Sequence, residues 1–200
     1  MYNLPEKAFI KKQLPKAAIY KKFNLNTAAK AKFDSDISRI DIIGEISENT
    51  VSISKGDNVS SIFILQIALK LKDFDEKNIN LISKLIEQKI IFVLVCDNKA
   101  KLAVHYGKLF QTDWQNADDI AIEIKGLSLD SVYQNLITQI GNIHIENDNT
   151  LDEQIAKDEA KAKLNKEIVR LEKLARAEKQ PKKKFEIHNQ INQLKQELSI

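Results

Sequence analysis

The middle of the chain carries short apolar runs of strand length. Three of them, Ile40–Ser47, Thr50–Ser54 and Ser61–Lys72, are separated by the turn-forming residues Glu48-Asn49 and Lys55-Gly56-Asp57-Asn58. Glu48-Asn49 therefore predicts a tight hairpin between the first two runs. The third run is continuously apolar in its first half and alternates in its second, as expected for a central strand that emerges into solvent.

Two further strands and two helices follow. Ile90–Cys96 and Lys101–Tyr106 flank Asp97-Asn98-Lys99 and predict the clearest hairpin in the chain, and Ile120–Lys125 alternates like another strand. Asp75 precedes apolar residues at helical spacing, which predicts a capped helix over residues 76–88. A second helix is expected from Ser128 or Asp130 to Gly141.

The first 39 residues have a different pattern. Pro5, Pro15, scattered lysines and isolated aromatic residues in residues 1–26 predict an extended basic arm, with a short helical piece near Ala17–Lys22. An i, i+4 stripe of Ala29, Phe33 and Ile37 predicts a helix over about residues 27–38.

Beyond Thr150 the composition becomes helical. Large apolar residues are spaced by four, three and four positions on each side of Gln180-Pro181, and Pro181 disfavours a helical Gln180 but suits the first turn of a new helix. Folding the chain at Pro181 brings the two stripes face to face, which predicts an antiparallel two-helix hairpin. One long helix that dimerises is the alternative. The stripe consists of Leu164, Ile168, Leu171 and Ala175 before the turn and Ile187, Ile191, Leu194 and Leu198 after it.

The predicted fold is therefore α+β, a mixed and mainly antiparallel sheet with flanking helices, followed by the hairpin. We expect four regions: an arm over residues 1–26, an α+β domain over 27–143, a linker over 144–150 and the hairpin over 151–200. An isolated hairpin of this length is marginally stable, so it should lean on the body, a second copy or a partner.

The formal net charge of +3 conceals an uneven distribution. Residues 1–39 carry a net +6, residues 40–150 a net −6 and residues 151–200 a net +3. Basic ends of this kind meet phosphate, an acidic partner or the acidic middle of the same molecule.

Composition excludes several kinds of site. One cysteine, Cys96, rules out disulfides and multi-cysteine metal centres, and its place at the end of a buried strand predicts a core thiol. The three histidines lack partners at ligand spacing and the five glycines are dispersed, so we predict neither a metal, nor a cofactor, nor a phosphate loop. Trp114 is either an exposed anchor or a minor core residue. No apolar run is long enough for a membrane span and no signal peptide is recognised, so we expect a soluble, cytoplasmic protein.

The order of helix, three strands, helix and strand is also that of restriction-endonuclease-like nucleases. Those enzymes hold Mg²⁺ with an acid on the second strand and a Glu-x-Lys on the third. Here the third strand reads Gln66-Ile67-Ala68-Leu69-Lys70, so Ala68 occupies the carboxylate position, and the expected second strand, Thr50–Ser54, has no acid. Asp41 and Glu45 would lie one strand too early. The sequence predicts a degenerate site.

The predicted hairpin tip is strongly basic. Such a tip suits salt-sensitive, sequence-independent contact with nucleic acid, although Phe185 is the only aromatic residue there for stacking on bases. A solvated helix end is the other interpretation. The candidate residues are Arg176, Lys179, Lys182, Lys183 and Lys184.

Several segments together resemble an uncharacterised bacterial family described only as a domain of unknown function. The resemblance covers nearly the whole chain, and its motifs are structural. Members are typically encoded beside helicases and DNA methyltransferases in mobile or anti-phage defence loci, which implies an accessory subunit, and they often carry an acid where this chain reads Gln66-Ile67-Ala68. The matching segments are Met1-Tyr2-Asn3-Leu4-Pro5, Leu14-Pro15-Lys16 with Ile19-Tyr20, Phe33 with Ile37–Ile40, Phe63–Lys70, Ile91–Leu94, Leu129 with Val132-Tyr133, and Arg170–Glu172 with Glu178-Lys179.

We therefore expect a non-enzymatic adaptor of a defence or restriction-type assembly, in which the hairpin stripe docks a helicase-type or DNA-modifying protein. The alternative is a DNA-binding subunit or degenerate metal-dependent nuclease. A homodimer through the tail is the other partner considered.

Overall fold

A computed structural model describes residues 2–146 and 149–198. The chain divides into two compact units, residues 1–143 and 144–200. The first is the α+β body and the second is helical, which confirms the predicted fold class.

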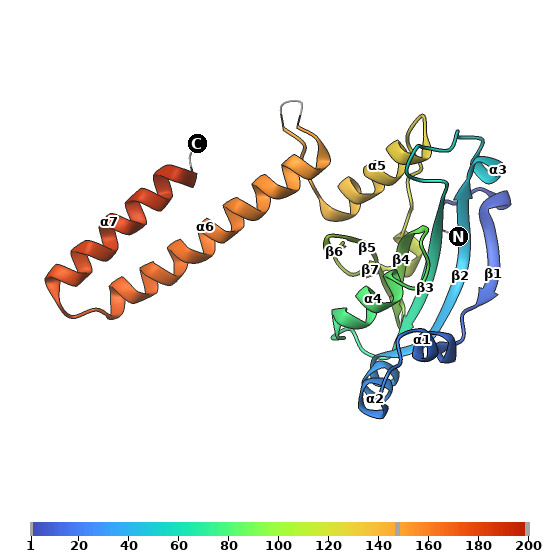
Figure 1. Ribbon diagram of the computed structural model, residues 1–200, viewed down its shortest axis with the longest axis horizontal. Helices are drawn as coiled ribbons and strands as arrows, with labels where there is room; N and C mark the ends of the chain where they lie inside the picture. Colours follow the sequence, from blue (N-terminus) through green and yellow to red (C-terminus); the bar gives the residue numbers. More distant parts are fainter. Residues whose placement is uncertain (1, 147–148, 199–200) are drawn as a thin grey trace. The chain divides into compact units, whose positions relative to one another are not determined.

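A seven-stranded sheet forms the centre of the first unit (Figure 1). Six strands run in the order β1-β2-β3-β4-β5-β6, and β7 pairs with the same edge of β5 that β6 uses. All neighbours are antiparallel except β3 and β4, which are parallel because α4 connects them. The strands are β1 (Phe9–Gln13), β2 (Ile37–Ser47), β3 (Ser61–Leu69), β4 (Lys89–Cys96), β5 (Lys99–Tyr106), β6 (Lys108–Gln111) and β7 (Gln115–Asn116).

Most helices of this unit begin where the sequence offers a cap. The side chain of Asn26 accepts a hydrogen bond from the Ala29 amide, and Asp75 accepts one from the Lys77 amide. Ser128 caps the last helix of the unit. The helices are α1 (Lys16–Lys22), α2 (Thr27–Asp36), α3 (Glu48–Val51), α4 (Glu76–Ser83) and α5 (Leu129–Gly141), with 3-10 turns η1 (Glu6–Ala8) and η2 (Ala117–Asp119).

One face of the sheet packs against α1, α2 and α4. Ile19, Phe33 and Ile79 from these helices are fully buried and form one cluster with Leu65 and Phe92 of the central strands. The cluster also contains Cys96, as expected for a core thiol. This face holds α1, α2 and α4 in place through the hydrophobic effect.

A β-bulge in β2 divides its isoleucines between the two faces. Ile42 pairs with Leu65 but Gly44 pairs with Ile64, so the register shifts by one residue at Ile43. Ile40 therefore belongs to the cluster under α1, α2 and α4, whereas Ile46 is buried outside it. The other face is where α5 packs, against β3, β5 and β6.

Two predicted strands are wrong. The tight hairpin around Glu48-Asn49 is a helical turn, because the Thr50 hydroxyl donates to the Glu45 carbonyl and accepts from the Ser47 amide. Apart from one bridge at Ser54, residues 50–54 form no strand. Ile120–Lys125 keeps its predicted alternation of buried and exposed side chains at Ile120 and Ile122, but its backbone pairs with Tyr2 rather than with a strand.

The segment predicted as an extended arm is part of the sheet. Phe9–Gln13 forms the edge strand β1, with Phe9 opposite Gly44 and Lys12 opposite Ile42. The short helix predicted near Ala17–Lys22 is α1, and α4 ends at Ser83, five residues before the predicted end.

The second unit is a hairpin of α6 (Leu151–Ala177) and α7 (Pro181–Leu198), which confirms the predicted turn at Gln180-Pro181. Thr150 starts α6 with a capping box, in which it accepts from the Glu153 amide while the Glu153 carboxylate accepts from the Thr150 amide. α7 packs against the part of α6 that is nearest the turn (Figure 1).

Within the described ranges, no helix has both the length and the apolar character needed to cross a membrane.

Candidate functional site

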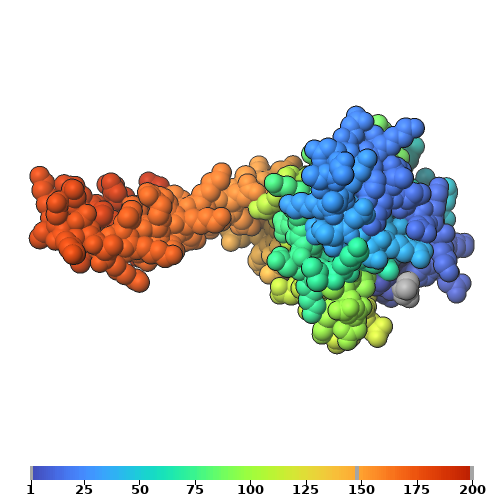
Figure 2. All heavy atoms as spheres, turned by 90° about the horizontal axis from the view of Figure 1, so that it is seen from below, coloured from blue at the N-terminus to red at the C-terminus, as the bar shows by residue number. Residues whose placement is uncertain are grey.

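The basic residues predicted at the hairpin tip surround its turn. Arg176 is in the last turn of α6, Lys179 in the link, and Lys182, Lys183 and Lys184 in the first turn of α7. All five side chains are exposed. Figure 2 shows this turn at the end of the hairpin that lies far from the start of α6.

Arg176 and Lys184 line the same groove between the two helices, with a volume of about 380 Å³. His188, Lys195 and Glu172 also line the groove. Lys195 forms a 2.9 Å ion pair with Glu172. Lys195 and, to a smaller extent, Arg176 hold the pKa of Glu172 below its ordinary value. The groove therefore presents positive charge around a single neutralised carboxylate.

The predicted partner-binding stripe lies inside the hairpin. Ile168, Leu171 and Ile191 are 3–6% exposed and form one cluster with Ala175. Ile187, Leu194 and Leu198 pack against this cluster, and Leu164 is half-buried one turn before it. Because these residues hold the two helices together, a partner would have to contact the outer faces of the hairpin. The sequence identified the pairing, but a stripe that pairs with itself leaves little apolar surface for a partner.

The nuclease-like positions also differ from their prediction. Since Thr50–Ser54 is not a strand, β2 is the direct neighbour of β3, and Asp41 lies opposite Gln66. Arg39 lies opposite Ala68 and forms a 2.7 Å ion pair with Asp41. Asp41 is therefore not one strand too early, and it comes together with the strand segment Gln66–Ala68.

This arrangement does not favour a metal. Asp41 is neutralised by Arg39, and Gln66 and Ala68 contribute no second carboxylate. Among residues 2–146 and 149–198, no three His, Cys, Asp or Glu side chains gather in a way that could hold a metal ion.

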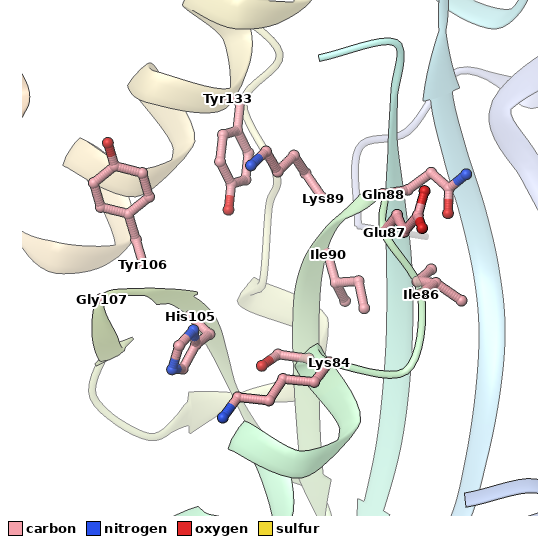
Figure 3. A pocket seen from close by; sticks show the side chains of 11 residues that line it. Lys84, Ile86, Glu87, Gln88, Lys89, Ile90, His105, Tyr106, Gly107 and Tyr133 are labelled. Carbon is pink, nitrogen blue, oxygen red and sulfur yellow. The ribbon is translucent and has the colours of Figure 1, made fainter. Parts of the chain in front are cut away.

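A smaller hollow, which the sequence did not indicate, lies where β4 begins and β5 ends. Its volume is about 260 Å³, and its lining residues come from the end of α4, from the loop between α4 and β4, from both strands and from α5. Lys89 reaches over the Tyr133 ring, with Nζ 5.6 Å from its centroid, while His105 and Lys84 lie at the other end (Figure 3). Burial raises the pKa of Tyr133 to about 12, and burial together with Lys84 lowers that of His105. This hollow could not be predicted from the sequence, because it forms only where three segments that are distant in the sequence meet.

Comparison with protein-family models shows to which family the chain belongs. A family model for a domain of unknown function, DUF4391, matches residues 2–198. The chain belongs to the DUF4391 family. Neither the curated proteins nor the solved structures that were compared contain a match. The DUF4391 match covers both the sheet unit and the hairpin, so the basic turn lies within the family's own extent.

Proposed function

We propose that this chain is a non-enzymatic nucleic-acid-binding accessory subunit, and that the turn of its hairpin contacts the phosphate backbone. The observation that carries the proposal is the concentration of charge there. Residues 170–188 contain seven Lys or Arg against three Glu, whereas the rest of the hairpin carries slightly more acidic than basic residues. The net positive charge of the tail is therefore a property of its turn.

The lysines of the turn are available to an anion. Within the described part of the hairpin, Lys179, Lys182, Lys183 and Lys184 form no ion pair. Lysines that neutralise phosphates release condensed counterions, which makes binding strong at low salt and weak at high salt. Four such contacts correspond to a slope of about −3.6 in the logarithm of the binding constant against the logarithm of the salt concentration on duplex DNA.

Phe185 adds a contact of another kind. Its side chain is 67% exposed and follows directly after the three consecutive lysines at the start of α7. An exposed ring beside cations can stack on an unpaired base, and such stacking tolerates any sequence. The turn therefore combines the two elements that single-stranded nucleic acid requires.

Fluorescence anisotropy with labelled single-stranded and duplex oligonucleotides, at two salt concentrations, tests the proposal. Replacing Lys182, Lys183 and Lys184 with Glu in the full chain should abolish binding at low salt. The matched control replaces Lys161, Lys163 and Lys166 with Glu, which makes the same charge change in the middle of α6 and should preserve most of the affinity. Equal losses in the two variants, or no binding by the unchanged chain, would contradict a role for the turn.

A partner-docking role is the second candidate, and the outer face of α6 favours it. Val169 and Leu174 are 50% and 44% exposed, whereas Leu151, Ile168 and Leu171 of the same helix are buried. The gene neighbourhood implied by the family resemblance suggests a helicase-type or DNA-modifying partner in an anti-phage or restriction-type assembly. Co-purification with the neighbouring helicase or methyltransferase should then be lost on replacing Val169 and Leu174 with Asp, and unaffected by the lysine replacements.

A further inference from the structure

A cavity lies on the sheet unit, well separated in sequence from the hairpin. Its volume is about 570 Å³, within the range of small-ligand pockets. It lies over β1, β2 and β3, and its polar residues come together only through strand pairing. The side chains that concern us are Phe9, Lys11, Arg39, Asp41, Ile43 and Gln66.

Two β-bulges shape this cavity. The register shifts between Phe9 and Lys12 in β1 and again at Ile43 in β2, on adjacent strands. Each bulge leaves residues outside the regular ladder and turns their side chains, and bulges are frequent beside functional sites for this reason. Phe9 and Ile43 supply apolar walls, and Phe9 remains 38% exposed.

The polar groups are held in defined orientations. The Tyr2 hydroxyl donates a 2.9 Å hydrogen bond to Oε1 of Gln66, which fixes the side-chain amide and leaves its Nε2 group as a donor for another partner. Nε of Arg39 donates a 2.9 Å hydrogen bond to Oδ1 of Asp41 and forms an ion pair with Oδ2 at 2.7 Å. The guanidinium keeps its Nη donors, and the carboxylate keeps further acceptor capacity.

We propose that this cavity binds a nucleotide unit, with its base against Phe9 and Ile43 and its phosphate near Lys11 and Arg39. A base offers a flat apolar face and an edge of donors and acceptors, which Gln66 and Asp41 can read. The neutralised carboxylate and the additional Lys11 leave a net positive charge for one phosphate. A free mononucleotide and a strand end share this chemistry.

Isothermal titration of the full chain with AMP, with a 5′-phosphorylated hexadeoxyadenylate and with inorganic phosphate tests the proposal. We expect AMP or the hexamer to bind and phosphate alone to bind much more weakly. Gln66→Leu should reduce affinity about tenfold, because one oriented amide contact is lost without a change in volume. Binding of AMP assigns the site to free nucleotides. Binding of the hexamer alone assigns it to a strand end when Gln66→Leu weakens that binding and the glutamates at positions 182–184 do not.

Lys11→Ala and Lys12→Ala form the matched pair. Lys11 lines the cavity and Lys12, the next residue of the same strand, does not, so only the first replacement should weaken binding, by several-fold. Tyr2→Phe should reduce the affinity less than Gln66→Leu does, since it removes only the hydrogen bond that orients the Gln66 side-chain amide. No binding of either nucleotide, binding unaffected by Gln66→Leu, or equal affinity for phosphate alone would overturn the proposal.

The turn and the cavity can fail separately. The variant with glutamates at positions 182–184 should bind AMP as the unchanged chain does, and Gln66→Leu should leave duplex binding by the turn intact. Loss of duplex binding together with retained nucleotide binding would remove the proposed function and keep the cavity.

Discussion

The ammonium of Lys101 lies 4.8 Å from the centroid of the Trp114 ring and 5.0 Å from that of Phe74. Lys101 is only 8% exposed, and burial lowers its pKa although Glu76 and Asp113 act in the opposite direction. Trp114 packs against the main core cluster, so of the two interpretations of its sequence the minor core residue describes it better. Through Phe74, these contacts lie next to the start of α4.

Lys101→Met should change the free energy of unfolding by less than about 1 kcal/mol. The cation–π attraction that is lost contributes about 0.5–2 kcal/mol, but the cost of burying a charge disappears with it. Urea denaturation followed through the fluorescence of Trp114, the only tryptophan, measures this directly. A loss of several kcal/mol would show that the ammonium has a partner more important than the two rings.

Leu171→Ala and Leu174→Ala test the hairpin seam with identical chemistry on one helix. Leu171 is 6% exposed in the seam and Leu174 is 44% exposed. We expect Leu171→Ala to destabilise the hairpin by about 2–4 kcal/mol and Leu174→Ala by less than about 1 kcal/mol. Hydrogen exchange of peptides from residues 151–198 reports on this unit alone, and similar exchange in the two variants would contradict the pairing.

Gly56→Ala should be destabilising because of a specific neighbour. A Cβ atom at Gly56 would lie 2.3 Å from Cγ of Asp130, whose carboxylate accepts hydrogen bonds from the amides of Asp57 and Asn58. We expect a cost of about 1–3 kcal/mol in the free energy of unfolding.

The same substitution in an Asp130→Ala background should cost less, since the crowded carboxylate is absent. A thermal-denaturation double-mutant cycle measures the difference, and strict additivity would contradict the proposed clash.

His105 should make stability depend on pH. Burial and the charge of Lys84 hold its folded-state pKa below the ordinary value, against a weaker backbone hydrogen bond. The unfolded imidazole therefore binds a proton first, at about pH 6.5, so stability falls as the pH decreases through that value towards the folded pKa. The Tm should be lower at pH 5.5 than at pH 7.5.

His105→Gln should reduce this difference in Tm, measured by calorimetry in the two buffers. His188→Gln provides the control, because His188 is exposed on α7 and its replacement should leave the difference unchanged. Lys84, Glu87, Lys89, Tyr106 and Tyr133 also line this hollow, so Lys84→Met should raise the pKa of His105 and weaken the dependence as well.

Local signals predicted the parts of the fold that depend on local structure. Asp75 starts α4 and Pro181 starts α7, from positions that the sequence displays openly. Ile40, Ile42, Gly44 and Ile46 alternate as if they shared one face, however, and only pairing with β3 shows the bulge at Ile43. Pattern alone does not contain a register shift, because the partner strand determines where it occurs.

The candidate sites also differ in whether they depend on local sequence or on strand pairing. The basic turn could be predicted because its residues are neighbours in the sequence. The cavity could not, since the meeting of Asp41 with Gln66 requires that β2 be adjacent to β3, and the misplaced hairpin at Glu48-Asn49 put another strand between them.

The 27 residues of α6 also separate two electrostatic environments. At 1.5 Å per residue the helix is about 40 Å long, which is about five Debye lengths at physiological ionic strength. Asp152, Glu153, Asp158 and Glu159 cluster near its start, and the basic turn follows its other end. The acidic residues therefore neither screen nor steer what approaches the turn, and charge can be changed at either end of the hairpin without an effect on the other.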